Sequence, residues 1–298
     1  GTVTIGGNLT MHGNIGATNA TGNFTISEWN SLTLASNVST FNSDNMTLSD
    51  NTVLNFGNVT SGYNRGSSET LTFASNITMG SNSTINVGNG TTLNGNIYGT
   101  AGTLNVLGNF TSTGSIGAAQ VDGADFITSR LEQINISKGN TFTLNNNATA
   151  TRMNINGTVT VAGNITAAVT MGADGILNLN NESGDDNAAK VVGAIDGYDA
   201  QQGTLNINGT FTTQGVIGGT YGLSAINLSN STWANGFTTT FAHNVNATTI
   251  QIGTATTQNN ATLQITAGGT SAGVNIAVTG NIIGGGNATS IDNAAGGI

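Results

Sequence analysis

The sequence predicts an all-β protein, a parallel β-helix (β-solenoid) built from three repeats of about 100 residues. Three observations predict it: a phrase that returns at a fixed interval, short segments in which apolar and polar residues alternate, and the absence of proline. The phrase reads GTVTIGGNLTMHGNIG from Gly1, GTLNVLGNFTSTGSIG from Gly102 and GTLNINGTFTTQGVIG from Gly203. Because an internal repeat at a fixed interval indicates a repeat architecture, it is the first constraint on the fold.

The alternating segments predict short strands. Segments such as TVTI and NLTM place an apolar residue at every second position, which is typical of a half-buried strand. Glycine and asparagine separate them and supply the positive-φ corners between strands. Proline cannot donate to a β ladder, so its absence agrees with a backbone that lies mostly in strands. No segment shows a sustained helical period, and we expect few helices or none.

The length of the repeat predicts how the chain is wound. A hundred residues exceed one winding of a solenoid, so each repeat is expected to hold four or five windings of roughly 20–25 residues. The expected organisation is one continuous solenoid with repeats at 1–101, 102–202 and 203–298. Each strand pairs with the winding above at about 4.8 Å, inward apolar side chains form columns, and asparagines at stacked corners form ladders.

A second architecture, three tandem β-sandwich modules, also fits a repeat of this length. Sandwich modules usually carry proline at edges and turns and more aromatic residues in the core. This chain has no proline and only 5% aromatic residues. The solenoid is therefore the preferred prediction.

The composition excludes several functions. The net charge is −9, which disfavours binding to nucleic acid or to an anionic membrane surface. No run approaches the eighteen or so apolar residues of a membrane-spanning helix. The lack of cysteine excludes disulfides and thiolate metal sites and fits an extracellular bacterial protein held by hydrogen-bond ladders. The first residue is Gly1, so we expect a processed chain or part of a larger one.

The basic residues are few, and we expect them to be folded away and the protein to resist trypsin. They are Arg65, Arg130, Lys138, Arg152 and Lys190.

Candidate chemistry is sparse. The two histidines, His12 and His243, stand at polar positions that look exposed, and no GxSxG, HExxH or GxxxxGK[ST] motif occurs. The acidic residues are mostly scattered; the exception is the segment NNESGDDN, which holds Glu182, Asp185 and Asp186 and is followed by Asp196 and Asp199. Three interpretations stay open: a solvated acidic loop, a Ca²⁺ site with hard oxygen ligands, and a carboxylate pair for glycoside hydrolysis. No other cofactor is expected.

The phrase TLN-x-x-G-x-x-T-x-x-G-x-IG, followed by an LxxIN step and a TF strand, resembles the passenger regions of bacterial autotransporters. The closest likeness is to the large surface antigens of rickettsiae. The resemblance implies secretion through a C-terminal membrane barrel, display at the bacterial cell surface, and adhesion or a surface layer. It implies no catalytic residues.

Three hypotheses for the function follow. The first is a non-enzymatic extracellular structural protein whose partners are copies of itself, because uncapped terminal windings would present open strand edges that join into a fibre or surface layer. The second is an adhesin that binds a cell-surface ligand through loops such as the one around Glu182. The third is a polysaccharide-active β-helix.

Overall fold

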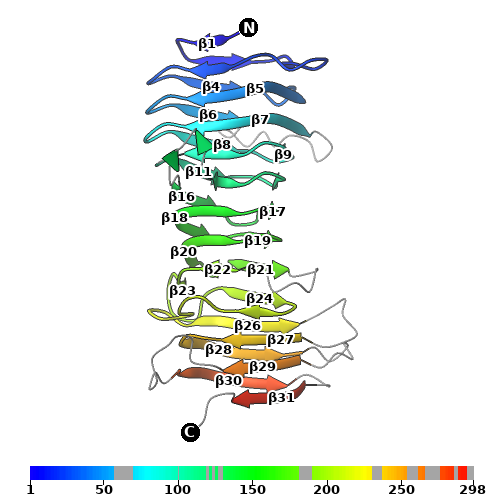
Figure 1. The fold of residues 1–298 in the computed structure, drawn as a ribbon, viewed down its shortest axis with the longest axis vertical. Coiled ribbons are helices and arrows are strands. Elements are labelled where there is room, and N and C mark those ends of the chain that lie inside the picture. The colour runs from blue at the N-terminus through cyan, green and yellow to red at the C-terminus, as the bar shows by residue number, and fades with distance from the viewer. Residues whose placement is uncertain are drawn as a thin grey trace. The chain divides into compact units, whose positions relative to one another are not determined.

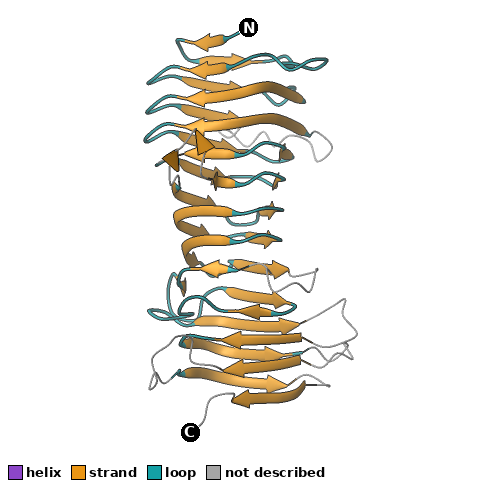
Figure 2. Cartoon of the chain, viewed as in Figure 1, coloured by secondary structure: helices purple, strands orange, loops and turns teal. Residues whose placement is uncertain are grey.

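The structure is a computed structural model. It describes residues 1–56, 70–99, 101–118, 121–122, 125–126, 130–180, 190–229, 237–253, 261–265, 276–284 and 288–293. The chain divides into two compact units, Gly1–Met153 and Asn154–Ile298. No helix occurs among the described residues, whose regular elements are all strands (Figure 2).

Unit 1 is a parallel β-helix with three rows of stacked strands. The first row holds β1 (Val3–Ile5), β3 (Phe24–Ile26), the C-terminal halves of β5 (Thr40–Leu48) and β7 (Leu71–Met79), β10 (Ile97–Gly99), β13 (Ile116–Ala118) and the start of β18 (Ala148–Ile155). The second holds β2 (Leu9–Met11), β4 (Ser31–Leu34), β6 (Val53–Phe56), β8 (Thr84–Val87), β11 (Thr103–Val106) and β16 (Leu131–Ile136), of which β4, β6 and β8 are easily followed in Figure 1. The third holds the N-terminal halves of β5 and β7, with β9 (Thr91–Leu93), β12 (Phe110–Ser112) and β17 (Thr141–Leu144).

Unit 2 is wound in the same way. Its first row holds β19 (Thr158–Val161), β21 (Ile176–Asn180), β24 (Thr204–Asn208), β26 (Leu223–Ser229) and the C-terminal halves of β28 (Val245–Ile252) and β30 (Val278–Gly284). A second row holds β20 (Ile165–Met171), β22 (Val191–Val192), β23 (Ile195–Gly197) and the starts of β28 and β30. A third row holds β25 (Phe211–Thr212), β27 (Phe237–Phe241), β29 (Ala261–Ile265) and β31 (Ala288–Asn293).

The predicted winding is confirmed, and the sandwich alternative is wrong. Antiparallel sheets build sandwiches, whereas the strand pairings that form the rows of both units are parallel. Among the described residues one pair is antiparallel, β14 (Val121–Asp122) with β15 (Asp125–Phe126), and it lies outside these rows. The first row of unit 1 has rungs at residues 3, 24, 46, 77, 97 and 116, so successive windings take 19 to 31 residues.

The sequence repeat does not contain a whole number of windings. Val3 and Leu104 open the first two repeats, yet Val3 lies in the first row of unit 1 and Leu104 in the second. Four windings lead from Val3 to Ile97 in the same row, and the strand with Leu104 follows. A residue of the second repeat therefore lies one row further along the winding than its equivalent in the first repeat. The three rows of the unit are similar enough to accommodate this shift.

Apolar columns fill the inside of each unit. Strand burial alternates as predicted; in β7 all five odd-numbered residues from Leu71 to Met79 are buried. In unit 1 the rings of Phe41 and Phe73 stack in parallel with centroids 4.6 Å apart, and Phe56 lies 4.7 Å from Phe73. In unit 2 the side chain of Thr239 is buried, and its hydroxyl has no hydrogen-bond partner among the described residues.

Asparagine side chains form a ladder along the outer face of the second row of unit 1. Asn135 Nδ2 donates to Asn105 Oδ1 at 2.8 Å, and Asn105 Nδ2 donates to Asn86 Oδ1 at 2.9 Å. The ladder continues from Asn86 to Asn55 at 2.9 Å. A second ladder in unit 2 joins Asn227, Asn206 and Asn178 at 2.8 and 2.7 Å.

The predicted ladders at the corners also exist, but they bond to backbone. Asn76 Oδ1 accepts from the N–H of Asn96 at 3.0 Å, and Asn96 Oδ1 accepts from the N–H of Ser115 at 2.8 Å. Asn89 and Asn109 make the same contact at another corner, at 3.1 Å. Each corner amide thus satisfies a backbone donor in the next winding, which a turn would otherwise leave unpaired.

Candidate functional site

The predicted calcium ligands Glu182, Asp185 and Asp186 lie outside the described residues. Two acidic residues that follow them are described. Asp196 Oδ1 accepts from the N–H of Thr220 at 3.1 Å, and Asp199 Oδ1 accepts from the N–H of Ala200 at 2.7 Å. Both carboxylates therefore hold loops in place.

The described residues contain no group of three or more His, Asp or Glu side chains that could hold a metal ion. His12 is exposed and His243 is half-buried. The two histidines lie in different units, so they do not form one site within either unit.

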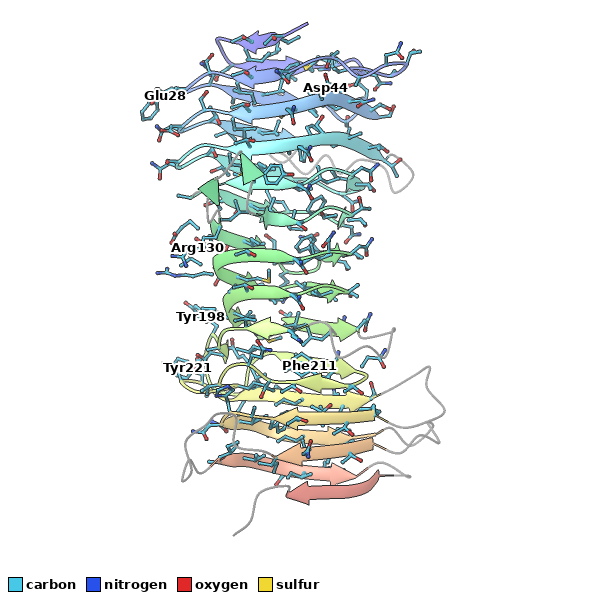
Figure 3. All side chains as sticks on the ribbon, in the orientation of Figure 1. Glu28, Asp44, Arg130, Tyr198, Phe211 and Tyr221 are labelled. Atoms are coloured by element: carbon cyan, nitrogen blue, oxygen red, sulfur yellow. The ribbon has the colours of Figure 1, made fainter. Side chains whose placement is uncertain are left out.

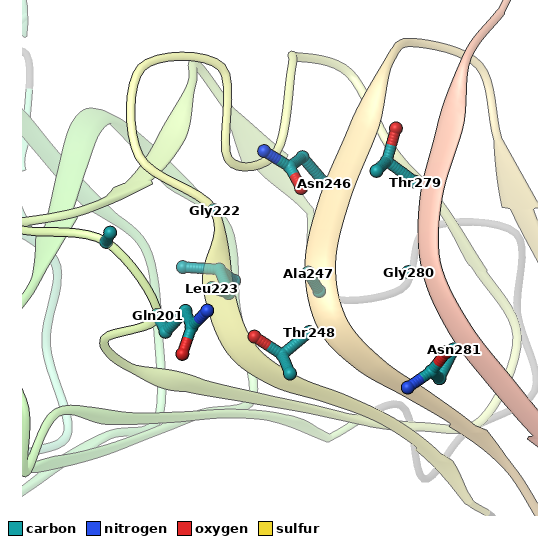
Figure 4. A pocket seen from close by; sticks show the side chains of 10 residues that line it. Gln201, Gly222, Leu223, Asn246, Ala247, Thr248, Thr279, Gly280 and Asn281 are labelled. Carbon is teal, nitrogen blue, oxygen red and sulfur yellow. The ribbon is translucent and has the colours of Figure 1, made fainter.

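A polar groove lies on unit 2, where two loops meet the starts of β28 and β30. It has a volume of about 510 Å³. Its amide and hydroxyl groups belong to Gln201, Asn246, Thr248, Thr279 and Asn281, with Leu223 between them (Figure 4). A neighbouring hollow of about 310 Å³ shares Asn246 and Thr279 with it.

The two loops at the groove are joined through their backbones. The N–H of Gly197 donates to the carbonyl of Tyr221 at 3.0 Å, and the N–H of Gln201 donates to the carbonyl of Gly222 at 2.9 Å. Tyr198 is 75% exposed and Tyr221 is 43% exposed. Both rings extend outward on the same side of unit 2 (Figure 3). The groove was not predicted from the sequence. The available signal was that two of the chain's four tyrosines, Tyr198 and Tyr221, stand in glycine-rich segments.

The face of unit 1 formed by β1 and β2 is the second candidate site. Val3 is 39% exposed and Leu9 is 41% exposed, whereas their repeat equivalents Leu104 and Phe110 are 0% and 2% exposed. The difference has a simple cause. Strands β11 and β12 are covered by β8 and β9 of the preceding winding, and no described strand covers β1 and β2 on that side.

Glycines on the same face show the same contrast. A Cβ on Gly114 would collide with the carbonyl oxygen of Gly95, and one on Gly108 would collide with the backbone of Asn89. Their equivalents in the first repeat, Gly7 and Gly13, have nothing within 4 Å of the corresponding position.

No protein-family model, no curated protein and no solved structure matches this chain. None of the residues that the structure describes belongs to a helix with the length and hydrophobicity that a bilayer crossing requires.

Proposed function

We propose that this chain is a non-enzymatic structural protein of the bacterial cell surface, whose solenoid associates with copies of itself into a fibre or surface layer. The observation that carries the proposal is the contrast between equivalent glycines. Gly114 and Gly215 need to be glycine because the carbonyls of Gly95 and Gly193 in the preceding winding lie against them. Gly13 has the same place in the repeat, but no described atom lies within 4 Å of the position that its Cβ would take.

A winding that packed on β1 and β2 would explain both the glycines and the exposed apolar residues. It would bury Val3 and Leu9 as β8 and β9 bury Leu104 and Phe110. Burying one such side chain contributes roughly 1.5–3 kcal/mol, and the backbone edge of the strands would gain hydrogen bonds as well.

The occupant that we propose is the β30 winding of a second copy. The windings that cover the equivalent glycines belong to this chain itself, so the same kind of surface fits the face. β30 presents exposed apolar side chains, Ile282 at 38% and Ile283 at 46%. Pairing within the solenoid is parallel, so the two copies join head to tail, and such heterologous contacts build open filaments.

Sedimentation velocity and electron microscopy of the 298-residue chain test the proposal. We expect filaments or a concentration-dependent series of oligomers. In Gly13→Ala the added methyl group meets open space, so the melting temperature should stay that of the wild type while the association constant falls at least about tenfold. Gly114→Ala is the matched control, and it should lower the melting temperature because the same methyl group collides within the fold.

Two results would contradict the proposal. A wild-type chain that stays monomeric at all accessible concentrations would refute self-association. Filaments that form equally well from Gly13→Ala would remove the β1–β2 face as the contact.

An adhesin is the second candidate, and the groove of unit 2 favours it. Exposed tyrosines beside a polar groove are suited to ligand recognition, because tyrosine combines an apolar ring with a polar hydroxyl. Binding of the Gly13→Ala chain to intact cells, lost on Tyr198→Ala and Tyr221→Ala together, would support adhesion.

A further inference from the structure

The groove of unit 2 is lined entirely by uncharged residues. Its volume of about 510 Å³ falls within the range of small-molecule sites, about 300–1,000 Å³. No Lys or Arg lines it, so it lacks the groups that bind phosphate or carboxylate. No carboxylate lines it either, so it lacks the ligands that calcium prefers. The chemistry of the lining therefore favours a neutral, polar ligand.

The amides of the groove differ from those of the ladders. In the ladder of unit 2, Asn206 both donates to Asn178 and accepts from Asn227. In the groove, the side chains of Gln201, Asn246 and Asn281 have no hydrogen-bond partner among the described residues.

Each of these amides offers two N–H donors and a carbonyl acceptor. A hydroxyl group is both a donor and an acceptor, so a row of hydroxyls on a ligand would match a row of such amides. Thr248 and Thr279 add hydroxyl groups of their own (Figure 4).

Two exposed tyrosines, Tyr198 and Tyr221, stand on the loops that carry Ala200, Gln201 and Gly222 of the groove lining, although their own side chains are not part of that lining. The loops of Tyr198 and Tyr221 are tied together by the backbone bonds Gly197–Tyr221 and Gln201–Gly222, which hold the groove in shape before a ligand arrives. The face of an aromatic ring carries partial negative charge, and it attracts C–H groups that carry partial positive charge. Pyranose rings present such C–H groups on their faces and hydroxyl groups around their edges.

We propose that this groove binds a neutral oligosaccharide. The amides of Gln201, Asn246 and Asn281 hydrogen-bond the hydroxyl groups, and the rings of Tyr198 and Tyr221 pack against the sugar faces. No bond of the ligand is broken. Thr279 and Asn281 lie in β30, the strand that we propose for the contact between copies, so binding is measured at concentrations where sedimentation shows monomers.

The test uses the full 298-residue chain and a panel of neutral tri- to pentasaccharides built from glucose, galactose, mannose or N-acetylglucosamine. Binding is measured by isothermal titration calorimetry and by saturation-transfer NMR. We expect at least one series to bind with a Kd in the range of about 10 μM to 1 mM, and acidic oligosaccharides of the same length to bind more weakly.

The variants separate the two parts of the site. Tyr221→Ala and Asn246→Leu should each weaken binding by about tenfold or more, while Tyr221→Phe, which keeps the ring, should weaken it less. Since Tyr221 and Asn246 are exposed, circular dichroism and the melting temperature should not change. Trp29→Ala is the matched control: Trp29 is 74% exposed and lies in unit 1, so its loss should leave binding unaltered.

Failure of the whole panel to bind at millimolar concentration would overturn the proposal. So would equal binding by the wild type and by the variant that combines Tyr221→Ala with Asn246→Leu, or a stronger loss from Trp29→Ala than from either groove variant.

Discussion

The contribution of the asparagine ladder of unit 1 to stability can be measured by replacing one of its residues, Asn105. Asn105 donates to Asn86 and accepts from Asn135, so Asn105→Ala removes two hydrogen bonds. Each contributes about 0.5–1.5 kcal/mol, and the free energy of unfolding should fall by about 1–3 kcal/mol. Asn145, an exposed residue, is the control, and Asn145→Ala should change it by less than about 0.5 kcal/mol.

Asn105→Asp gives a sharper test, because the introduced group has the same shape. As a neutral acid it can donate to Asn86 Oδ1 and accept from Asn135, whereas the carboxylate can only accept and places its charge against an oxygen. The fold therefore favours the protonated form, and the pKa of the introduced carboxyl group rises above its unfolded value of about 3.9. Stability relative to the wild type is then fully present below about pH 4 and is lost as the pH rises through the folded pKa.

Urea unfolding followed by far-ultraviolet circular dichroism measures both effects, at concentrations where sedimentation shows monomers. The variant should match the wild type at about pH 3.5 and be less stable by about 1–3 kcal/mol at about pH 7. If Asn105→Ala behaves like Asn145→Ala, or if the stability difference between Asn105→Asp and the wild type does not vary with pH, the ladder does not stabilise the fold as argued.

Three further results are expected. Phe73→Ala should lower the free energy of unfolding in urea by about 3–5 kcal/mol, because the ring is fully buried between two others; a loss below about 1 kcal/mol would contradict the packing. Thr239→Val should raise the melting temperature, since its buried hydroxyl has no described partner and an unsatisfied group costs about 1–3 kcal/mol; a lower melting temperature would show that the hydroxyl is satisfied. Calcium should raise the melting temperature if Glu182, Asp185 and Asp186 bind it, and Asp185→Asn should remove that increase; no change with calcium in the wild type would end the hypothesis.

The sequence was sufficient to predict the winding but not the phase of the repeat. Alternation in segments such as TVTI predicts which side chains are buried, and Leu104 and Val106 are buried accordingly. Alternation does not tell which of three rows a strand joins. That choice depends on how many residues each corner takes, so the shift between Val3 and Leu104 appears only in the structure.

Other predictions were wrong or incomplete for local reasons. The basic residues were expected to be folded away, but Arg130, Lys138 and Arg152 are exposed, because long charged side chains extend from the surface and keep their charge in water. Lys190 is half-buried, and Arg65 lies outside the described residues. Arg152 nevertheless lies within β18, so resistance to trypsin would come from its paired backbone. Asparagine ladders were expected at the corners, since asparagine is usually a turn residue. The ladder through Asn105 instead runs along paired strands of the second row. The groove escaped prediction because it brings together four segments between residues 200 and 281, and these become neighbours only when the windings stack.

The direction of the amide ladders has an electrical consequence. In both units the side chain of the later winding donates and that of the earlier winding accepts, as from Asn105 to Asn86 and from Asn206 to Asn178. The amide dipoles are therefore aligned, and aligned dipoles add, as they do along a helix. Each ladder turns its partial positive charge toward lower residue numbers and its partial negative charge toward higher ones. Two ladders that meet with opposite poles attract, and two that meet with like poles repel, so each unit has a built-in direction for a contact at the end of its ladder.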